Sequence, residues 1–429
     1  MKMNKLRDIV IDINRLGALS STSVRMNRFI LLSGESGLGK TYVSILCHYV
    51  YLMLTGHHLF DAFFRDKGLD DNYLQTMTAG QVEVEITKDE LETWIKGNAA
   101  TFIKYMLKSE HPADVVYHLP LKEKVLMKIN RVQQGLQGNE ICTARIQVEQ
   151  SPSFSYTLGG EKVNPRNPFT AALQLYLQEE ILGSSDALGI NYVLPPGRGT
   201  VMTEGLEPKT GLYLQFKRQF DKLRESELEG RKGNANLEKS IADILDGRVY
   251  KKEGGVYYYS TRGDDIPISA AASSIRELAP LSLFVEKYDL KKCALMIEEP
   301  EAHLHPLKQR AIADVLALLF AEGSHLVVST HSDYFLRRMN EILSVQKIYK
   351  DDPDNGKELA EKLKVFLSPE FNRAEISAYV LKRDSSTGLV TVVEQDVDKN
   401  FSFDSFDDVL RIDMQNYDAI QAYYASKED

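Results

Sequence analysis

Apolar and polar positions follow one another along this chain in blocks that predict an α/β fold. The short apolar run 29–32 has the length and uniform hydrophobicity of a buried strand. Residues 41–54 then carry apolar side chains at helical spacing, which predicts a helix directly after that strand. Between residues 267 and 350, helical patterns again alternate with apolar runs. We therefore expect a core of parallel or mixed sheet that is covered by helices.

The stretch between these two parts has a different character. It contains an alternating segment, three helical patterns and a second strand-like run, in the order 82–86, 91–107, 121–132, 144–148 and 169–182. Helical patterns dominate, so we expect a large, mostly helical insertion. A further strand at 191–194 ends in a loop of prolines and a glycine.

The second half carries turn signals. The polar run 218–236 predicts either a surface hairpin of helices or a loop. Tyrosine-rich runs on both sides of Gly254 and Gly255 predict a β-hairpin. From residue 351 the chain begins as a charged loop and continues with a hairpin-like pair around 385–388. We accordingly divide the chain into four parts, namely core residues 1–55, the insertion 56–190, core residues 191–350, and a small α+β region, 351–429, outside the core.

Composition restricts the classes of function. The 429 residues carry a formal net charge of −9, which argues against coating nucleic acid by bulk charge but leaves room for a local basic groove. Cys47, Cys142 and Cys293 lie far apart in the sequence, and we expect buried thiols in a reducing compartment. Neither a signal-peptide core nor an apolar run long enough to span a bilayer is visible, so we expect a cytoplasmic protein that does not enter the membrane.

The most specific motif follows the first strand. Residues 34–41 fit the pattern G-x-x-x-x-G-K-[ST] of a phosphate-binding loop. Its members are the candidate nucleotide-binding residues: Gly34, Glu35, Ser36, Gly37, Leu38, Gly39, Lys40 and Thr41. Glycines let the backbone N–H groups wrap an anion at the N-terminus of the helix. Lys40 would reach the β- and γ-phosphates, and the hydroxyl of Thr41 would bind Mg²⁺. The motif therefore predicts ATP and Mg²⁺ as ligands.

A nucleotide site of this kind also needs carboxylates, and two acids end the apolar run 293–297. Strand ends of a parallel sheet meet at the edge where ligands bind. Glu298 would hold Mg²⁺ through water, and Glu299 would polarise the attacking water. From these residues alone, a strand that simply exits into a charged loop explains the pattern equally well.

Further motifs stand in a fixed order, namely 194–198 (Leu-Pro-Pro-Gly-Arg), 273–278 (Ser-Ser-Ile-Arg-Glu-Leu), 297–306 (Ile-Glu-Glu-Pro-Glu-Ala-His-Leu-His-Pro) and 329–332 (Ser-Thr-His-Ser). With the phosphate loop, this order resembles the ABC-type ATPases of the SMC and overcoming-lysogenization-defect (OLD) group, whose members are also classed as AAA-type proteins. The resemblance covers residues 5–55 and about 190–350.

The resemblance implies roles for residues outside the phosphate loop. Ser273, Ser274 and Arg276 would belong to a degenerate signature motif, residues 301–305 to the D-loop, and His331 would be the switch histidine that senses the γ-phosphate. Two protomers would sandwich each ATP head to tail, so the chain would be a homodimer or a higher homo-oligomer. The signature has Ile275 in place of a glycine and the phosphate loop has Ser36 in place of asparagine, so we expect slow hydrolysis.

Three features have two readings each. Arg198 either contacts the nucleotide or organises the insertion, or it is a loop arginine bound to backbone carbonyls. His303 and His305 could be imagined in a metal cluster, but the family resemblance already explains them, and we expect no dedicated transition-metal site. Acidic residues at 394–398 form either a solvated surface or a docking face for a basic partner.

The size and acidic balance look like the ATPase subunit of PARIS-type anti-phage systems. That resemblance implies a separate effector nuclease of the TOPRIM class, which a phage-encoded trigger would release. A fused OLD-type nuclease would need a longer C-terminal extension than the residues after 350. The alternative is an SMC-like ATPase of DNA repair or chromosome organisation, which usually needs a long heptad arm, and residues 56–260 show no sustained heptads. A transporter ATPase would need a standard signature.

Overall fold

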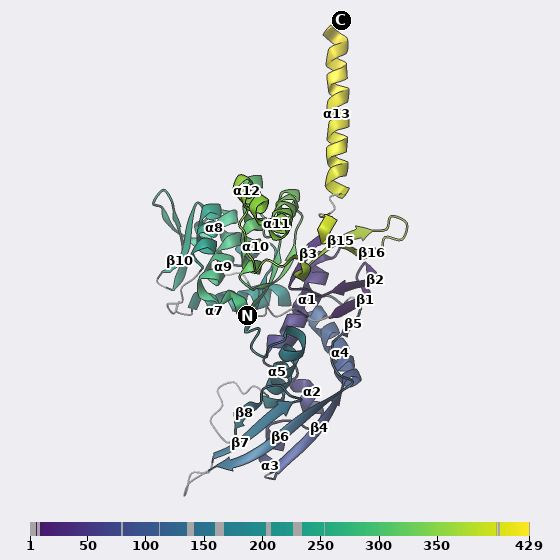
Figure 1. Cartoon of the computed structure of the whole chain (residues 1–429), viewed down its shortest axis with the longest axis vertical. Coiled ribbons are helices and arrows are strands. Elements are labelled where there is room, and N and C mark those ends of the chain that lie inside the picture. The colour runs from purple at the N-terminus through teal and green to yellow at the C-terminus, as the bar shows by residue number, and fades with distance from the viewer. Residues whose placement is uncertain are drawn as a thin grey trace.

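A nine-stranded mixed sheet forms the centre of the molecule, as the sequence predicts (Figure 1). The computed structural model describes residue 6 and residues 9–78, 80–110, 112–134, 141–158, 167–202, 207–225, 234–252, 254–399, 401 and 404–428. The strand order is β5-β1-β2-β16-β15-β3-β14-β13-β9. The N-terminal residues 1–5 and the centre of the expected 218–236 hairpin lie outside the described residues.

One half of this sheet is parallel and buried on both faces. Its strands are β15 (Ile376–Arg383), β3 (Phe29–Ser33), β14 (His325–Ser329), β13 (Cys293–Glu298) and β9 (Ile190–Leu194). Successive residues of β3 point to opposite faces, so Ile30 and Leu32 pack in one hydrophobic core, while Phe29 and Leu31 pack in the other. This two-sided burial explains why the strand sequences are uniformly apolar.

Helices cover both faces of the parallel half. On one face lie α1 (Lys40–Thr55) and α5 (Pro168–Leu182). On the other lie α7 (Gly211–Glu225), α8 (Ala235–Leu245), α9 (Ser273–Lys287), α10 (Pro306–Ala321), α11 (Asp333–Asp351) and α12 (Pro353–Leu363). The described parts of the predicted 218–236 hairpin are helical. Two short segments, α6 (Arg198–Val201) and the 3₁₀ turn Leu290–Lys292, connect elements of this layer.

The other half of the sheet comprises β5 (Ala113–His118), β1 (Val10–Leu16), β2 (Leu19–Arg25) and β16 (Val390–Gln395). Strands β1, β2 and β5 pair antiparallel, and β16 joins β2 to β15. Strand β15 pairs directly with β3, which carries the phosphate loop. The prediction that residues after 351 lie outside the core is therefore wrong, because β15 and β16 complete its sheet.

The same region contains a second correction. Residues 351–356 are not a loop, because α11 continues to Asp351 and α12 starts at Pro353. The side chain of Asp352 accepts a hydrogen bond from the backbone N–H of Asn355 and caps α12, and Pro353 occupies the first helical position. The charged run that suggested a loop is a helix start.

The insertion combines helices with a second sheet and is not mostly helical. Its elements are α2 (Asp61–Asp66), α3 (Asp71–Thr76), β4 (Gly80–Thr87), α4 (Lys88–Leu107), β6 (Lys124–Gln134), β7 (Ile141–Val148) and β8 (Phe154–Thr157). The helix predicted at 121–132 is strand β6. Val125, Met127 and Ile129 are buried at every second position, but Val125 and Ile129 also stand four residues apart, which mimics a helical face.

Two peripheral elements complete the molecule. The predicted hairpin forms β10 (Gly247–Lys252) and β11 (Gly255–Ser260), with β12 (Asp265–Pro267) alongside. Helix α13 (Asp404–Glu428) extends away from the body at the C-terminal end (Figure 1). Among the described residues, no helix has both the length and the apolar character needed to cross a membrane.

Candidate functional site

The phosphate loop turns from the end of β3 into the start of α1 through three glycines at positive φ. Gly34, Gly37 and Gly39 have φ angles of 127°, 76° and 98°. A Cβ atom at Gly34 would lie 2.7 Å from the carbonyl oxygen of Leu381 in β15, so the close packing of this strand requires glycine there. Gly39 caps α1 without a side-chain hydrogen bond. The helix N-terminus is therefore free of a side-chain cap that would compete with an anion.

Lys40 is held by the loop that precedes it. Its Nζ donates to the carbonyl oxygens of Gly34 and Glu35, each at 2.8 Å, and lies 3.3 Å from Nδ1 of His331. Burial lowers the pKa of Lys40 to about 8, against the opposing effect of Glu299 and Glu298. A phosphate would offer this partly desolvated ammonium a charged acceptor in place of neutral carbonyls.

Thr41 and Glu298 meet at the base of the site. The hydroxyl of Thr41 donates to Oε2 of Glu298 at 2.7 Å, and Glu298 is only 1% exposed. Burial raises the pKa of Glu298 to about 7. A hydroxyl and a carboxylate at this distance are oxygen ligands of the kind that Mg²⁺ prefers, so the residues fit the predicted metal. Thr41 and Glu298 would hold the ion, which would neutralise phosphate charge.

Glu299 and His331 face each other across the opening. Glu299 has a φ of 46°, and its N–H donates to the carbonyl oxygen of Ser329, which turns the chain sharply after β13. Its Oε1 lies 3.7 Å from Nε2 of His331. Burial and the charge of Lys40 lower the pKa of His331, so the imidazole is neutral near pH 7. One carboxylate and one neutral imidazole thus flank the place where the terminal phosphate of a nucleotide would sit.

Lys40, Thr41, Glu299 and His331 line one cavity of about 510 Å³, and Glu298 is linked to its lining through the hydrogen bond from Thr41. The lining residues come from the phosphate loop, the ends of β13 and β14, and the turn between β1 and β2: Gly17, Ala18, Leu19, Ser36, Gly37, Leu38, Gly39, Lys40, Thr41, Tyr42, Glu299, Ser329 and His331. Sequence reasoning missed Gly17–Leu19 and Tyr42. The one available signal was Gly17, which adopts a φ of 60° in the turn and packs closely against the ring of Tyr42.

Glu301 is a positioning residue that sequence reasoning placed only within the D-loop. One oxygen of its buried carboxylate accepts hydrogen bonds from the hydroxyl of Thr330 and from the N–H of His331, both at 2.7 Å. Burial raises the pKa of Glu301. Ser332 then donates to Gln309 at 2.5 Å and caps α11. Glu301 and Gln309 thereby hold the chain on the two sides of His331.

The predicted signature residues lie elsewhere. Ser273 and Ser274 begin α9, and Arg276 donates to the hydroxyl of Ser273 at 3.4 Å. None of the three belongs to the residues that line the cavity. Within one chain, the structure therefore brings together the phosphate loop, Glu298, Glu299 and His331, and leaves the signature residues outside this group.

Arg198 connects these separate parts. Its Nε donates to the carbonyl oxygen of Glu277 in α9 at 2.7 Å, and its Nη1 donates to the carbonyl oxygens of Pro195 and Glu298. The guanidinium is 1% exposed and lies 3.6 Å from the Glu277 carboxylate. Of its two readings, binding of backbone carbonyls describes the contacts that the structure shows. Arg198 joins the end of β13 to the signature helix.

His303 and His305 lie at the turn that leads into α10. His305 caps α10, where its Nδ1 accepts from the N–H of Leu307 at 3.4 Å, and His303 has a φ of 63° in the turn before it. Within the described part of the chain, no group of three or more histidine, cysteine or acidic side chains is arranged to hold a metal ion.

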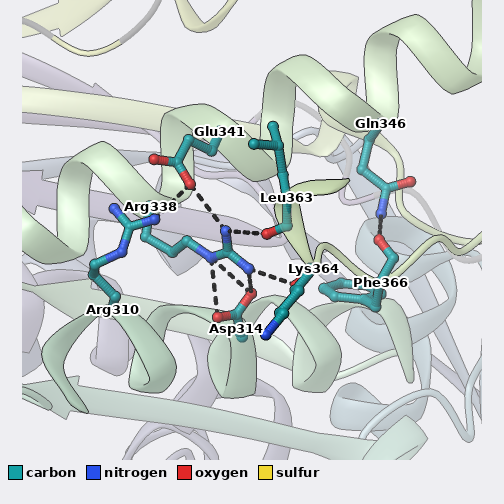
Figure 2. Close-up of polar contacts among 8 residues, drawn as sticks. All are labelled: Arg310, Asp314, Arg338, Glu341, Gln346, Leu363, Lys364 and Phe366. Carbon is teal, nitrogen blue, oxygen red and sulfur yellow. Dashed lines mark hydrogen bonds and ion pairs between the residues drawn. The ribbon is translucent and has the colours of Figure 1, made fainter. Parts of the chain in front are cut away.

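A buried arginine ties together the helices behind the site (Figure 2). Arg338 of α11 binds both carboxylate oxygens of Asp314 in α10 at 3.0 Å, and Glu341 at 2.9 Å. It also donates to the carbonyl oxygens of Leu363 and Lys364 at the end of α12. Helix α10 follows residues 301–305, and α11 follows His331. Through its hydrogen bonds, Arg338 therefore joins the helices after these two segments to the end of α12.

One family model of an ATPase domain is similar to part of this chain. Residues 204–336 match the family model described as "AAA ATPase domain", a range that includes Ser273, Glu298, Glu299 and His331 but not the phosphate loop. No curated protein matches the chain.

Several solved structures are similar to the chain at low identity. A structure of the Smc head bound to the C-winged helix domain of ScpA is 12% identical, with 92% of this chain and 98% of that chain covered and a TM-score of 0.39. The SMC head domain from Thermotoga maritima is 11% identical, with 91% and 99% covered and a TM-score of 0.35. An Smc head domain with an extended coiled coil, bound to the C-terminal domain of ScpA derived from Pyrococcus furiosus, is 10% identical, with 96% and 100% covered and a TM-score of 0.38.

Proposed function

We propose that this chain binds ATP with Mg²⁺ and hydrolyses it slowly as a conformational switch. The observation that carries the proposal is that Lys40, Thr41, Glu299 and His331 line one cavity, and that Thr41 donates a hydrogen bond to the buried Glu298. Lys40 and the glycine-rich loop bind the phosphates, Thr41 and Glu298 hold the metal, Glu299 orients the attacking water, and His331 contacts the terminal phosphate.

Lys40→Ala tests the binding step. Because the ammonium is the charge inside the phosphate loop, we expect its loss to abolish ATP binding in isothermal titration calorimetry. Lys357→Ala, which removes an exposed lysine of α12, is the matched control and should bind as the wild type does. Unchanged affinity in Lys40→Ala would refute the site.

Hydrolysis would involve two copies of the chain. Ser273, Ser274 and Arg276 lie outside the cavity of their own protomer, which is what a site completed by the signature helix of a second protomer requires. ATP would then be bound between two chains, and binding and release would close and open the dimer.

The finer biological role rests on the resemblance to PARIS-type ATPases. We propose that the switch regulates a separate effector nuclease of the TOPRIM class in anti-phage defence and responds to a phage-encoded trigger. The acidic net charge of −9 suits a protein partner better than non-specific DNA binding. Of the acidic residues at 394–398, Asp398 forms an ion pair with Arg373 and Asp396 pairs with Lys399, so Glu394 is the acid among them that we select for docking.

Co-expression with the protein encoded by the neighbouring gene tests this role. Glu394→Lys should release a bound nuclease while ATP hydrolysis stays unchanged, and Glu358→Lys on exposed α12 is the charge-matched control. If the purified chain cleaves nucleic acid by itself, and this activity depends on its own residues, the regulatory role is wrong.

A further inference from the structure

Helix α13 presents large apolar side chains to solvent along most of its length. Every residue from 408 to 424 is exposed, and Figure 1 shows the helix standing clear of the body. The exposed apolar residues are Val409, Leu410, Ile412, Met414, Tyr417, Ile420, Tyr423 and Tyr424, each between 47% and 68% exposed. A surface helix of a single chain normally buries such residues.

The apolar residues occupy one side of the helix. At 3.6 residues per turn they span an arc of roughly 200°, and Arg411, Gln415 and Asp418 lie on the opposite side. This arc is wider than the stripe of roughly 100° that a helix on a single core needs. Most helical stability in proteins comes from packing an apolar face. Helix α13 therefore requires another element that packs against this face.

One line of residues within this arc has the spacing of a coiled-coil seam. Val409, Asp413, Asn416, Ile420 and Tyr423 follow one another at intervals of four and three residues. Apolar side chains stand towards the two ends of this seam, and the polar pair Asp413 and Asn416 stands in its middle. A seam with one polar layer is a device that fixes register and partner in coiled coils.

We propose that α13 is covered by α13 of a second copy, antiparallel, with the two-fold axis passing between residues 414 and 415. In this register Asp413 lies opposite Asn416 of the second copy, so each carboxylate receives an amide donor. Val409 lies opposite Ile420, which places an apolar layer on each side of the polar pair. One register therefore pairs Asp413 with Asn416 and also aligns the apolar layers.

A parallel, in-register arrangement lacks this complementarity. In a parallel, in-register pair, the two Asp413 carboxylates would face each other inside the seam, and burying two like charges is unfavourable. In the antiparallel pair, Leu410 instead flanks Tyr417 of the second copy and extends the apolar contact beyond the seam. The sequence of the seam therefore selects the antiparallel second copy.

The interface that follows is independent of nucleotide. It goes beyond the proposed function, because it joins chains through the C-terminal helix and not through the phosphate loops. A chain with two self-complementary interfaces can build closed assemblies larger than a dimer or extended chains. Nucleotide-driven closure at one interface would then act on chains already joined at the other.

Light scattering of the full chain without nucleotide tests the interface. We expect the wild type at no less than twice the chain mass of 48.5 kDa, and Ile420→Asp at 48.5 kDa. The matched control is Ala422→Asp, which adds the same charge on the polar side and should keep the wild-type mass. A monomeric wild type, or equal dissociation by both substitutions, would overturn the proposal.

Disulfide cross-linking tests the register. A chain carrying both Val409→Cys and Ile420→Cys should give a covalent dimer on a non-reducing gel, because the two thiols meet across the axis. Arg411→Cys with Asp418→Cys places thiols at the same heights on the polar side and should give no covalent dimer. Val409→Cys alone should also give no covalent dimer, because its two copies lie roughly 16 Å apart along the axis. The oxidised wild type gives the background of its three native cysteines.

Cross-linking by Val409→Cys alone would show a parallel pair and refute the antiparallel register. Cross-linking of the polar-side pair to the same extent would show unspecific contact and refute the seam. A double variant that stays monomeric on the gel would refute the interface. None of these results depends on ATP binding, so each can be told apart from a failure of the proposed function.

Discussion

Two neighbouring carboxylates at the end of β13 have opposite surroundings. Glu298 is buried against Thr41, whereas the side chain of Glu299 is 39% exposed and faces His331. Of these two acids, Glu299 lines the cavity and lies 3.7 Å from His331. We therefore expect Glu299→Gln to bind ATP, to lose hydrolysis by roughly 100-fold or more, and to accumulate as a closed dimer.

Phosphate release measures the loss of hydrolysis, and the increase in mass on adding ATP, measured by light scattering, reports the closed dimer. Glu358→Gln, which neutralises an exposed acid of α12, serves as the control for loss of charge. Wild-type turnover by Glu299→Gln would show that the water-activating role belongs to another residue.

The raised pKa of Glu298 makes metal binding depend on pH. With a pKa of about 7, this carboxyl is mostly protonated at pH 6, and a bound cation requires the carboxylate. The pKa of Lys40, lowered to about 8, keeps its ammonium charged over the same range. Affinity for Mg²⁺–ATP should therefore rise roughly five- to tenfold between pH 6 and pH 7.5, with proton release on binding.

Calorimetry in buffers of different ionisation enthalpy measures the protons released. ATP itself titrates in this range, so Glu298→Gln is the necessary reference, since it retains the titration of the nucleotide and lacks the carboxyl. Equal proton release by wild type and variant would show that Glu298 is already ionised at pH 6.

At the scale of elements, Arg338 holds α10, α11 and α12 together (Figure 2). Its side chain is 7% exposed, so Arg338→Ala would leave Asp314 and two helix-terminal carbonyl groups without their donor. Removing one partner of such a buried pair costs about 3 to 5 kcal/mol in the free energy of unfolding.

Urea denaturation measures this loss. Arg337→Ala is the neighbouring control, because that arginine is 44% exposed and pairs with Asp333 on its own helix, a contact worth about 0.5 kcal/mol or less. Similar losses for the two variants would contradict the role of Arg338 as the joint between the helices.

Periodic elements of this fold could be predicted from sequence, and their pairing could not. The strands 29–33, 293–298 and 325–329 are uniformly apolar because both faces are covered, and the sequence shows this directly. The sequence predicts a helix where β6 lies, because the buried residues of this strand also stand four apart. The place of β15 in the core depends on pairing with β3 over more than 300 residues of sequence, which no local pattern reports.

The candidate site shows the same division. The phosphate loop and the acids after β13 can be recognised in the sequence, because their chemistry needs consecutive residues. The turn at Gly17–Leu19 and the ring of Tyr42 reach the cavity only through the pairing of β1 with β2. The contacts of Arg198 with Glu277 and Glu298 likewise join residues far apart in sequence, so sequence left its two readings open.

At the scale of the whole molecule, the proposed nucleotide site would be divided between two surfaces of one chain. The cavity holds the phosphate loop, and the start of α9 with Ser274 lies outside it. Arg198 donates hydrogen bonds to the carbonyl oxygens of both Glu298 and Glu277, and thus links the end of β13 to α9. An isolated protomer would bind ATP, and paired protomers would hydrolyse it.

Mixing two inactive variants tests this division. In a mixed dimer of Lys40→Ala with Ser274→Arg, one site combines the intact phosphate loop of one chain with the intact signature helix of the other, and the second site carries both lesions. Half of the dimers in an equal mixture are mixed, so we expect roughly a quarter of wild-type turnover for two equivalent sites. Phosphate release from each variant alone and from the mixture measures it. Co-purification of one variant with an affinity-tagged copy of the other controls for subunit exchange, because only exchanged dimers carry both chains. If exchange occurs and the mixture of the two variants stays inactive, each chain completes its own site and the shared arrangement is wrong.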